Sequence, residues 1–234
     1  MFKRRSHFPL FIVIIGVLWY VFSLYHHKVC VHVWWIDFLF LCVGFFGLLI
    51  RIFTIGFTPK GTSGRNTGEG QVAEQLNTSG IYAMVRHPLY LGNFFMWLAP
   101  VFIISDLWFT LFFCAFYWIY YERIMFAEEQ FLRKKFGQAY LDWASKTPAF
   151  IPNLSLYKKA NLQFSLKNVL KREYNSFFSL VFTMTLVRAI GFSVTTKQCY
   201  LDTPWIIIFF TASVIFLSLK ILKKATRVLE VEGR

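Results

Sequence analysis

The sequence has few acidic residues, no paired cysteines and no nucleotide-binding fingerprint. Only 12 Asp and Glu accompany 25 Lys and Arg among 234 residues. The cysteines at 30, 42, 114 and 199 are scattered without a C-x-x-C pair, which argues against a disulfide framework and a zinc knuckle. No internal repeat is evident. No G-x-G-x-x-G motif follows a strand pattern, so a soluble Rossmann nucleotide domain is excluded.

Apolar and aromatic side chains are abundant instead, at 56% and 21% of the residues. Soluble domains are about 45–50% apolar, so this composition predicts a membrane protein. A bilayer-spanning helix needs about 20 apolar residues. The apolar runs near that length cover residues 8–25, 33–57, 89–104, 107–121, 177–194 and 204–219. We therefore expect an all-α polytopic transmembrane bundle of about six spans.

The basic residues lie almost entirely on one predicted side of the membrane. If the six runs are spans, 21 of the 25 Lys and Arg fall in the segments on one side, and only Lys28 and Lys197 fall on the other. Arg51 and Arg188 lie within spans: Arg51 is near enough to the cytoplasmic end to snorkel, whereas Arg188 is deeper and is expected to have a partner. Because cytoplasmic loops are enriched in Lys and Arg, both termini are predicted to be cytoplasmic. The net charge of +13 then faces anionic headgroups, and no nucleic-acid partner is expected.

One cluster of polar residues stands just before the third run, in the stretch R-H-P-L-Y-L-G at 86–92. A proline in the first turn predicts a helix beginning near Pro88. The three-residue step places His87 and Tyr90 on nearly one face, and Gly92 permits close approach of a ligand or a helix. Arg86 beside the helix start forms a corner suited to an anion. The alternative is that Arg86 and Tyr90 only anchor the helix at the membrane interface, with the Arg side chain extending to the headgroups and the Tyr in the interfacial aromatic belt.

A second polar group falls on an apolar helical stripe after the fourth run. Steps of three and four residues join the members of this stripe, which are Met125, Glu129, Leu132, Phe136, Tyr140 and Trp143. A carboxylate on the apolar face of a membrane-surface helix needs a partner, and Arg86 is the candidate. The alternative is a lone Glu at the edge of a lipid-lying helix. Gly137 weakens the pattern and predicts a break at Phe136–Gly137.

Two further stretches invite a binding role. The linker at 56–67 contains three glycines, hydroxyl side chains, Lys60 and Arg65, which suits phosphate or carboxylate, although a flexible linker is the simpler interpretation. Three histidines at 26–32 superficially suggest zinc, but no carboxylate supports them and they lie on the opposite side. We predict no metal site.

The combination resembles the isoprenylcysteine carboxyl methyltransferase and phospholipid methyltransferase family. The similarity rests on R-H-P-L-Y-L-G at 86–92, E-E-Q-F-L-R-K-K-F-G-Q-A-Y at 128–140, the prolines at 148 and 152, and Gly-Ile-Tyr at 80–82. It covers about residues 45–153. It does not account for the first span or the last two. We therefore divide the chain into 1–57, a methyltransferase core at 58–153, and 154–234.

The resemblance implies that S-adenosylmethionine binds in a membrane-edge pocket covered by the amphipathic helix. It implies a cofactor cavity lined by Tyr82, Arg86, His87, Pro88, Tyr90 and Gly92, with Glu129 opposite. Arg86, His87, Glu129 and Arg123 are the candidate catalytic residues. Lys60, Arg65 and Arg123 are the candidate ligands of an anionic acceptor.

The expected activity is transfer of a methyl group to the head of a lipid or lipidated acceptor in the membrane, favoured as O-methylation of a carboxylate or phosphate. The alternative enzyme is a phosphatidylethanolamine-type N-methyltransferase. The non-enzymatic alternative is a transporter subunit or a haem- or metal-assembly protein. The sequence does not fix the acceptor or the oligomeric state.

Overall fold

The computed structural model describes residues 8–26, 31, 33–59, 66–67, 70–71, 73–198 and 201–233. In chain order its α-helices are α1 Phe8–Tyr25, α2 Trp34–Gly56, α3 Pro88–Ile104, α4 Leu107–Phe136, α5 Gln138–Ala144, α6 Leu166–Thr196 and α7 Thr203–Ala225. Two 3-10 turns, η2 Ile81–Ala83 and η3 Leu154–Leu156, lie between them. The two-residue strands β1 Asn66–Thr67 and β2 Gly70–Gln71 pair antiparallel, with Asn66 opposite Gln71.

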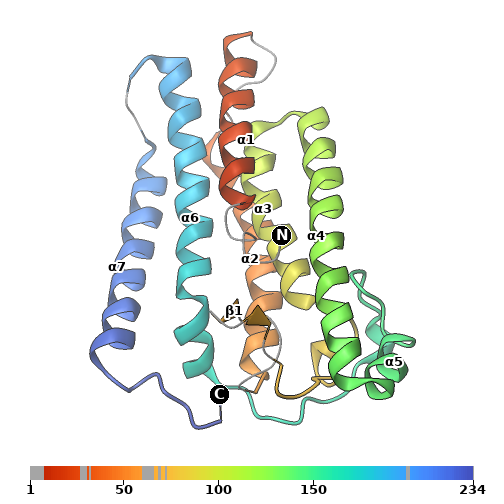
Figure 1. The fold of residues 1–234 in the computed structure, drawn as a ribbon. Coiled ribbons are helices and arrows are strands. Elements are labelled where there is room, and N and C mark those ends of the chain that lie inside the picture. Colours follow the sequence, from red (N-terminus) through yellow and green to blue (C-terminus); the bar gives the residue numbers. More distant parts are fainter. Residues whose placement is uncertain are drawn as a thin grey trace.

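Six helices lie side by side and the short α5 folds back at one end of α4 (Figure 1). The predicted all-α membrane bundle is therefore confirmed. Among the described residues α2, α6 and α7 are long and apolar enough to cross a membrane. The apolar parts of α1 and α3 are shorter. Since α4 ends in a charged half, the count of six spans stays a prediction.

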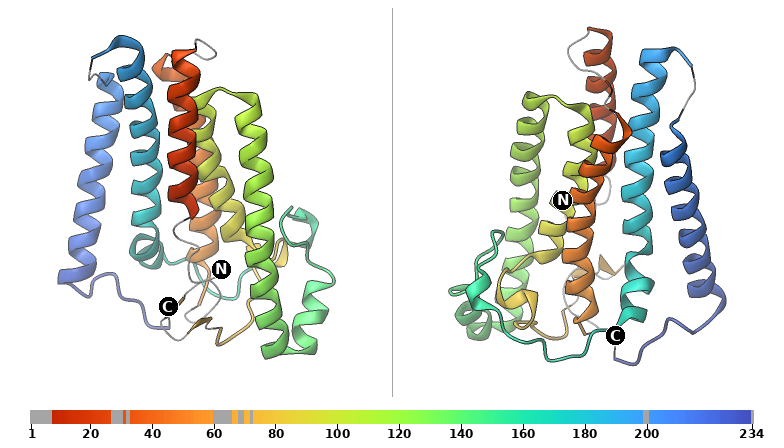
Figure 2. Two further views of the ribbon diagram at one scale, coloured as in Figure 1. Left: turned by 45° about the horizontal axis from the view of Figure 1, so that its top comes forward. Right: turned by 180° about the vertical axis from the view of Figure 1, so that it is seen from behind.

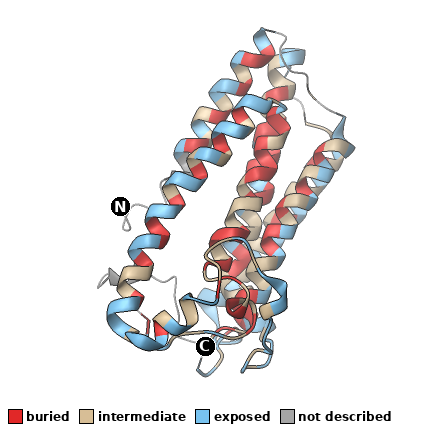
Figure 3. Ribbon diagram, turned by 90° about the vertical axis from the view of Figure 1, so that its right-hand side faces the viewer, coloured by how far each residue is buried: buried red, intermediate tan, exposed pale blue. Residues whose placement is uncertain are grey.

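The centre of the bundle is α2, which lies between α3 and α6 when the molecule is seen from behind (Figure 2). Buried positions concentrate on the inner helices (Figure 3). Without a hydrophobic driving force between helices in lipid, small residues that let backbones approach favour association. A Cβ added at Gly92 would lie 2.6 Å from Arg51 Cγ and 2.7 Å from the Gly47 carbonyl oxygen. Gly92 therefore serves the contact between α2 and α3.

The chain reverses its direction at two turns. Ser105 adopts a left-handed conformation and the Asp106 side chain caps α4 by accepting a hydrogen bond from Phe109 N at 2.7 Å, which makes a tight α3–α4 hairpin. Gly137, with φ 54°, ends α4 and starts α5, which confirms the predicted break. This break turns α5 back toward η2.

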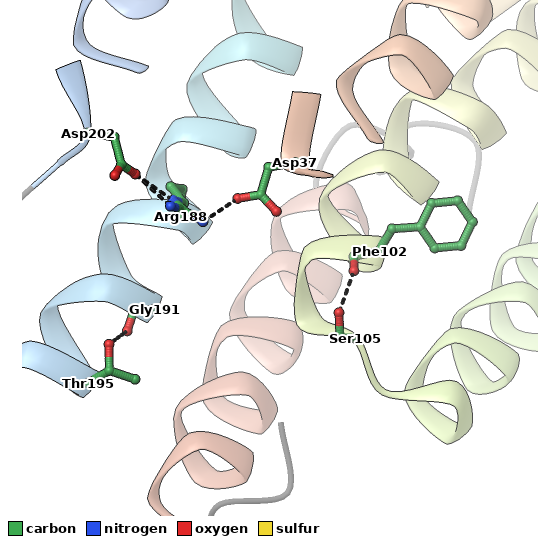
Figure 4. A network of polar contacts seen from close by, with 7 residues as sticks. All are labelled: Asp37, Phe102, Ser105, Arg188, Gly191, Thr195 and Asp202. Atoms are coloured by element: carbon green, nitrogen blue, oxygen red, sulfur yellow. Dashed lines mark hydrogen bonds and ion pairs between the residues drawn. The ribbon is translucent and has the colours of Figure 1, made fainter. Parts of the chain in front are cut away.

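A buried ion cluster joins α2, α6 and the start of α7 (Figure 4). Arg188, 2% exposed, donates to Asp37 Oδ2 at 2.7 Å and to Asp202 Oδ2 at 2.9 and 2.6 Å. Asp37 is fully buried. The sequence predicted that Arg188 needs a partner, and the structure supplies two carboxylates. Ionisable groups at membrane depth are costly, so each of them depends on the others.

The second intramembrane cation, Arg51, does not snorkel to the cytoplasmic surface as the sequence suggested. Its guanidinium is held by both oxygens of Glu173 at 2.7 Å and donates to Asn93 Oδ1 at 2.6 Å. A bidentate hydrogen bond to a nearby carboxylate stabilises the guanidinium inside the bundle, so the side chain does not extend to the headgroups. The three-part division of the chain stays a prediction. However, the Arg51–Glu173 and Arg188–Asp37 pairs each join the segment 1–57 to the segment 154–234.

We predict that Arg188→Met lowers the free energy of unfolding by about 3 kcal/mol, because it leaves Asp37 and Asp202 without their counter-charge. Unfolding in mixed micelles measures the change. Lys197→Met, at the exposed end of the same helix, is the matched control and should unfold like the wild type. Adding Asp37→Leu and Asp202→Asn to Arg188→Met should recover part of the loss. Equal stability of Arg188→Met and the wild type would show that the cluster contributes nothing.

Candidate active site

The polar cluster predicted before α3 is held in place by backbone hydrogen bonds. Pro88 is the first residue of α3, as predicted, and its missing N–H costs nothing there. The chain that follows α5 runs alongside the cluster. Arg86 N donates to the Pro148 carbonyl at 2.9 Å, and His87 N donates to the Ala149 carbonyl at 3.2 Å. The prolines at 148 and 152 favour an extended backbone in this segment, and its carbonyl groups accept these two hydrogen bonds.

The structure brings Arg86, His87 and Glu129 together. Glu129 Oε2 accepts from Arg86 at 3.2 Å, and Glu129 Oε1 lies 2.9 Å from His87 Nε2. His87 is buried, and its ring stacks on that of Tyr90 with centroids 5.6 Å apart. The expected pairing of Glu129 with the start of α3 is therefore present. It joins residues that are more than forty positions apart in the chain.

Glu128 is a member of the same cluster that the sequence analysis missed. It is 7% exposed, it accepts from the Tyr90 hydroxyl at 2.8 Å, and it lies 3.9 Å from His87 Nδ1. The imidazole thus stands between two carboxylates. A stripe that steps three residues from Met125 would have included Glu128, because Met125, Glu128 and Leu132 share the buried face of α4.

Ionisation of the cluster follows from these contacts. Burial alone would raise the pKa of Glu129, but the hydrogen bond and charge of His87, with the charge of Arg86, hold it below its ordinary value of 4.5. Glu129 is therefore a carboxylate at neutral pH. Burial, followed by the charge of Glu129, raises the pKa of Tyr140 to about 12. Tyr140 is therefore a neutral phenol.

The cluster forms one wall of a small cavity of about 20 Å³. Its other walls are Tyr82 from η2, Leu132 from α4, Tyr140 and Trp143 from α5, and residues 75–77. The Trp143 indole donates to the Tyr82 carbonyl at 3.1 Å, which closes α5 over the site. Arg86 also lines an open depression of about 590 Å³ that is bounded by residues 144–148 and 151–154.

Two buried donors in this wall have no hydrogen-bond partner of ordinary geometry within the described part of the chain. They are Arg86 Nε and the Tyr140 hydroxyl, although Glu129 and Arg86 lie close enough to that hydroxyl to affect its pKa. Buried polar groups are normally satisfied, so such atoms are candidates for binding a ligand or water. A cation, one lining carboxylate and three aromatic rings match the carboxylate, ammonium and sulfonium groups of S-adenosylmethionine in kind.

The remaining predicted residues are placed less centrally. Gly92 contacts α2, where its missing side chain makes room for Arg51. Like Pro88, Tyr90 and Glu129, it is not among the residues that line the small cavity, and the predicted cofactor lining stays a prediction. Arg123 is exposed on α4 and takes no part in the cluster. Lys60 and Arg65 lie outside the described residues.

The sequence profile of the phospholipid methyltransferase family matches residues 39–139. This segment belongs to that family. The match spans α2, α3 and α4 and contains Arg86, His87, Glu128 and Glu129, so the predicted family is confirmed. Tyr140 and Trp143 lie just beyond it, and α6 and α7 lie well outside it.

Similar proteins carry two kinds of name. A protein-S-isoprenylcysteine O-methyltransferase of Schizosaccharomyces pombe is 38% identical over 33% of this chain and 33% of its own length. One of Tribolium castaneum is 29% identical over 53% of this chain and 44% of its length. A cobalt-zinc-cadmium resistance protein of Cupriavidus metallidurans is 31% identical over 53% of this chain and 54% of its length. The chain thus spans a third to about half of these relatives. No solved structure matches it significantly.

We predict a pH dependence of stability that depends on Glu129. A carboxylate whose folded pKa is depressed stabilises the fold above its ordinary value of 4.5, and this contribution is lost as the pH falls through the lower folded value. Thermal unfolding across that window should show Glu129→Gln less stable than wild type at neutral pH, with the difference vanishing in acid. Glu122→Gln, exposed on the same helix, is the control. A pH-independent difference would contradict the ion-pair interpretation.

Proposed function

We propose that this protein is a membrane methyltransferase that uses S-adenosylmethionine to methylate the head of a lipid or lipidated acceptor. The observation that carries the proposal is that Arg86 and His87, just before α3, line one cavity with Glu128 of α4, while Glu129 bonds both Arg86 and His87. Its position within the segment that matches methyltransferases supports it.

Each residue of the cluster has a role in this proposal. Arg86 binds the cofactor carboxylate, since its Nε is buried and available for a second charged hydrogen bond. Glu129 accepts from the cofactor ammonium and holds Arg86 in position. Glu128 fixes the Tyr90 ring through the phenol, and Tyr90 in turn fixes His87. Tyr82, Tyr140 and Trp143 exclude water around the sulfonium.

The cavity is smaller than the cofactor, because ligand pockets of this kind measure roughly 300–1,000 Å³ and this one measures about 20 Å³. The wall at residues 75–77 is irregular chain between β2 and η2, with Gln75 exposed. We infer that this wall moves outward on binding. The open depression beside Arg86, lined by residues 144–148 and 151–154, would offer room for the nucleoside.

S-adenosylmethionine supplies an electrophilic methyl group on sulfur, so the protein mainly has to align the reactants. An ionised carboxylate or phosphate accepts that methyl without a general base. An amine acceptor must lose a proton, and His87 or Glu129, whose Nε2 and Oε1 are 2.9 Å apart, would be the candidate base. We favour the anionic acceptor, with Lys60, Arg65 and Arg123 as its predicted ligands.

The sidedness of the site follows from the charge distribution in this proposal. The α4–α5 break and the C-terminus lie at the same end of the bundle, opposite the α3–α4 turn (Figure 1). The basic tail and the basic end of α4 assign that end to the cytoplasm. Both termini and the site then face the compartment that contains S-adenosylmethionine.

Calorimetry with the purified protein tests the cofactor site. We expect Arg86→Ala and Glu129→Ala each to weaken binding of S-adenosylmethionine and its demethylated product by about ten- to hundredfold, the effect of losing a charged hydrogen bond. Arg133→Ala, an exposed cation on the same helix, should bind like the wild type. Absence of binding to the wild type, or equal binding to all three variants, would refute the proposed site.

The acceptor is identified by incubating membranes with methyl-labelled S-adenosylmethionine and analysing the labelled lipids by mass spectrometry. We expect label that mild base releases as methanol, as a methyl ester requires. Base-stable label in a series of singly, doubly and triply methylated amines would support the N-methyltransferase alternative instead.

A further inference from the structure

A cavity of about 200 Å³ with a mixed polar and apolar lining lies between α3 and α6. Its lining is Asn93, Met96 and Trp97 of α3 with Asn175, Ser176, Ser179, Leu180 and Thr183 of α6. Five of these eight side chains are neutral amides or hydroxyls. Polar side chains in the middle of apolar helices are costly in lipid, and those that persist there commonly mark a pathway or a site.

The α6 members form a single stripe. Asn175, Ser179 and Thr183 recur at steps of four residues, with Ser176 beside them, so they share one face. Ser179 and Thr183 lie within the apolar run 177–194, Asn175 and Ser176 stand just before it, and Asn175 and Ser179 are exposed. The stripe therefore presents hydrogen-bonding groups at the lipid boundary, where a molecule in the bilayer can reach them.

The cavity and the reaction cluster lie at successive positions along α3. Asn93 is one turn beyond Tyr90 and two beyond His87, or about 9 Å along the helix axis from His87. Asn93 Oδ1 accepts from Arg51 at 2.6 Å, and Arg51 also donates to Ser176 Oγ at 3.4 Å. Arg51 thus fixes one lining residue from each helix. A molecule that fills the cavity reaches toward His87 with its cytoplasmic end.

The charge of the lining selects the chemistry of the ligand. None of the eight lining residues carries a charge. The nearby cation Arg51 is already neutralised by the bidentate carboxylate of Glu173. An anionic group would therefore find no free counter-ion here, whereas an uncharged group with donors and acceptors would find five matching side chains.

We propose that this cavity binds the uncharged hydrogen-bonding neck of the lipid-borne acceptor, between its hydrocarbon chain and the atom that is methylated. The inference rests on the proposed function and adds the part of the substrate that gives specificity. A peptide amide and a polyol both provide such a neck. Because α6 lies outside the family segment at 39–139, the choice of neck belongs to the C-terminal part of this chain.

Cysteine protection tests the cavity without relying on turnover. Ser179→Cys is introduced where the four native cysteines are replaced by serine, and its alkylation rate is measured with a small maleimide in micelles. The probes form two matched pairs. N-acetyl-S-farnesylcysteine is compared with S-farnesylthiopropionate, which lacks the amide. Octadecyl glucoside 6-phosphate is compared with octadecyl phosphate, which lacks the sugar hydroxyls between chain and phosphate.

We expect the probe that carries the preferred neck to slow alkylation at position 179 about tenfold more than its matched partner, a ratio that a pair of hydrogen bonds accounts for. Protection by the first pair assigns an amide neck, and protection by the second assigns a polyol. Val214→Cys, exposed on α7 at a similar distance from the cytoplasmic end of its helix, is the control and should be unaffected. Equal alkylation with both members of each pair would overturn the proposal.

Failure of this inference is distinguishable from failure of the proposed function. Ser179→Leu fills the cavity from an exposed position. We expect it to raise the KM for the protecting probe about tenfold while cofactor binding by calorimetry stays unchanged. An unchanged KM with intact cofactor binding would refute the neck site alone. Loss of cofactor binding by the wild type would refute the methyltransferase, whereas protection at position 179 would still establish the cavity as a lipid site.

Discussion

Two adjacent carboxylates on one turn of α4 hold the start of α3, and the site depends on them. Glu129 bonds Arg86 and His87, whereas Glu128 bonds the Tyr90 hydroxyl. The hairpin at Ser105–Asp106 makes this possible, because it returns α4 along α3 until the pair lies opposite the cluster. The buried contacts of His87 therefore fix the register of the two helices as well as the chemistry between them.

The other intramembrane charges fix the rest of the bundle by the same physics. Arg51 and Arg188 each pair with a carboxylate on a helix far away in the chain, and each pair ties α2 to α6. A buried ion pair contributes little net stability compared with well-packed apolar side chains, but separating its partners is costly. Such pairs specify which helices are neighbours more than they strengthen the bundle.

Much of this arrangement could be predicted from local rules. Pro88 marks the start of α3, Gly137 marks the break after α4, and the steps between apolar residues place Glu129 opposite Arg86. What the sequence could not give depends on pairing between distant residues. The partners of Arg51 and Arg188 lie on α6, α2 and the start of α7, and no periodicity links them. Glu128 was missed because two stripes through Met125 fit the pattern, and only packing shows which carboxylate is more deeply buried.

The bond between Arg51 and Glu173 has a consequence for how the chain can be divided. Arg51 belongs to the segment shared with methyltransferases, and its counter-ion belongs to a helix that this family profile does not include. Excision of the shared segment would leave a bare guanidinium among apolar helices, so that fragment would not be a self-sufficient unit. The family segment therefore depends on α6. Transfer of this segment between homologous proteins would require residues 51 and 173 to be transferred together.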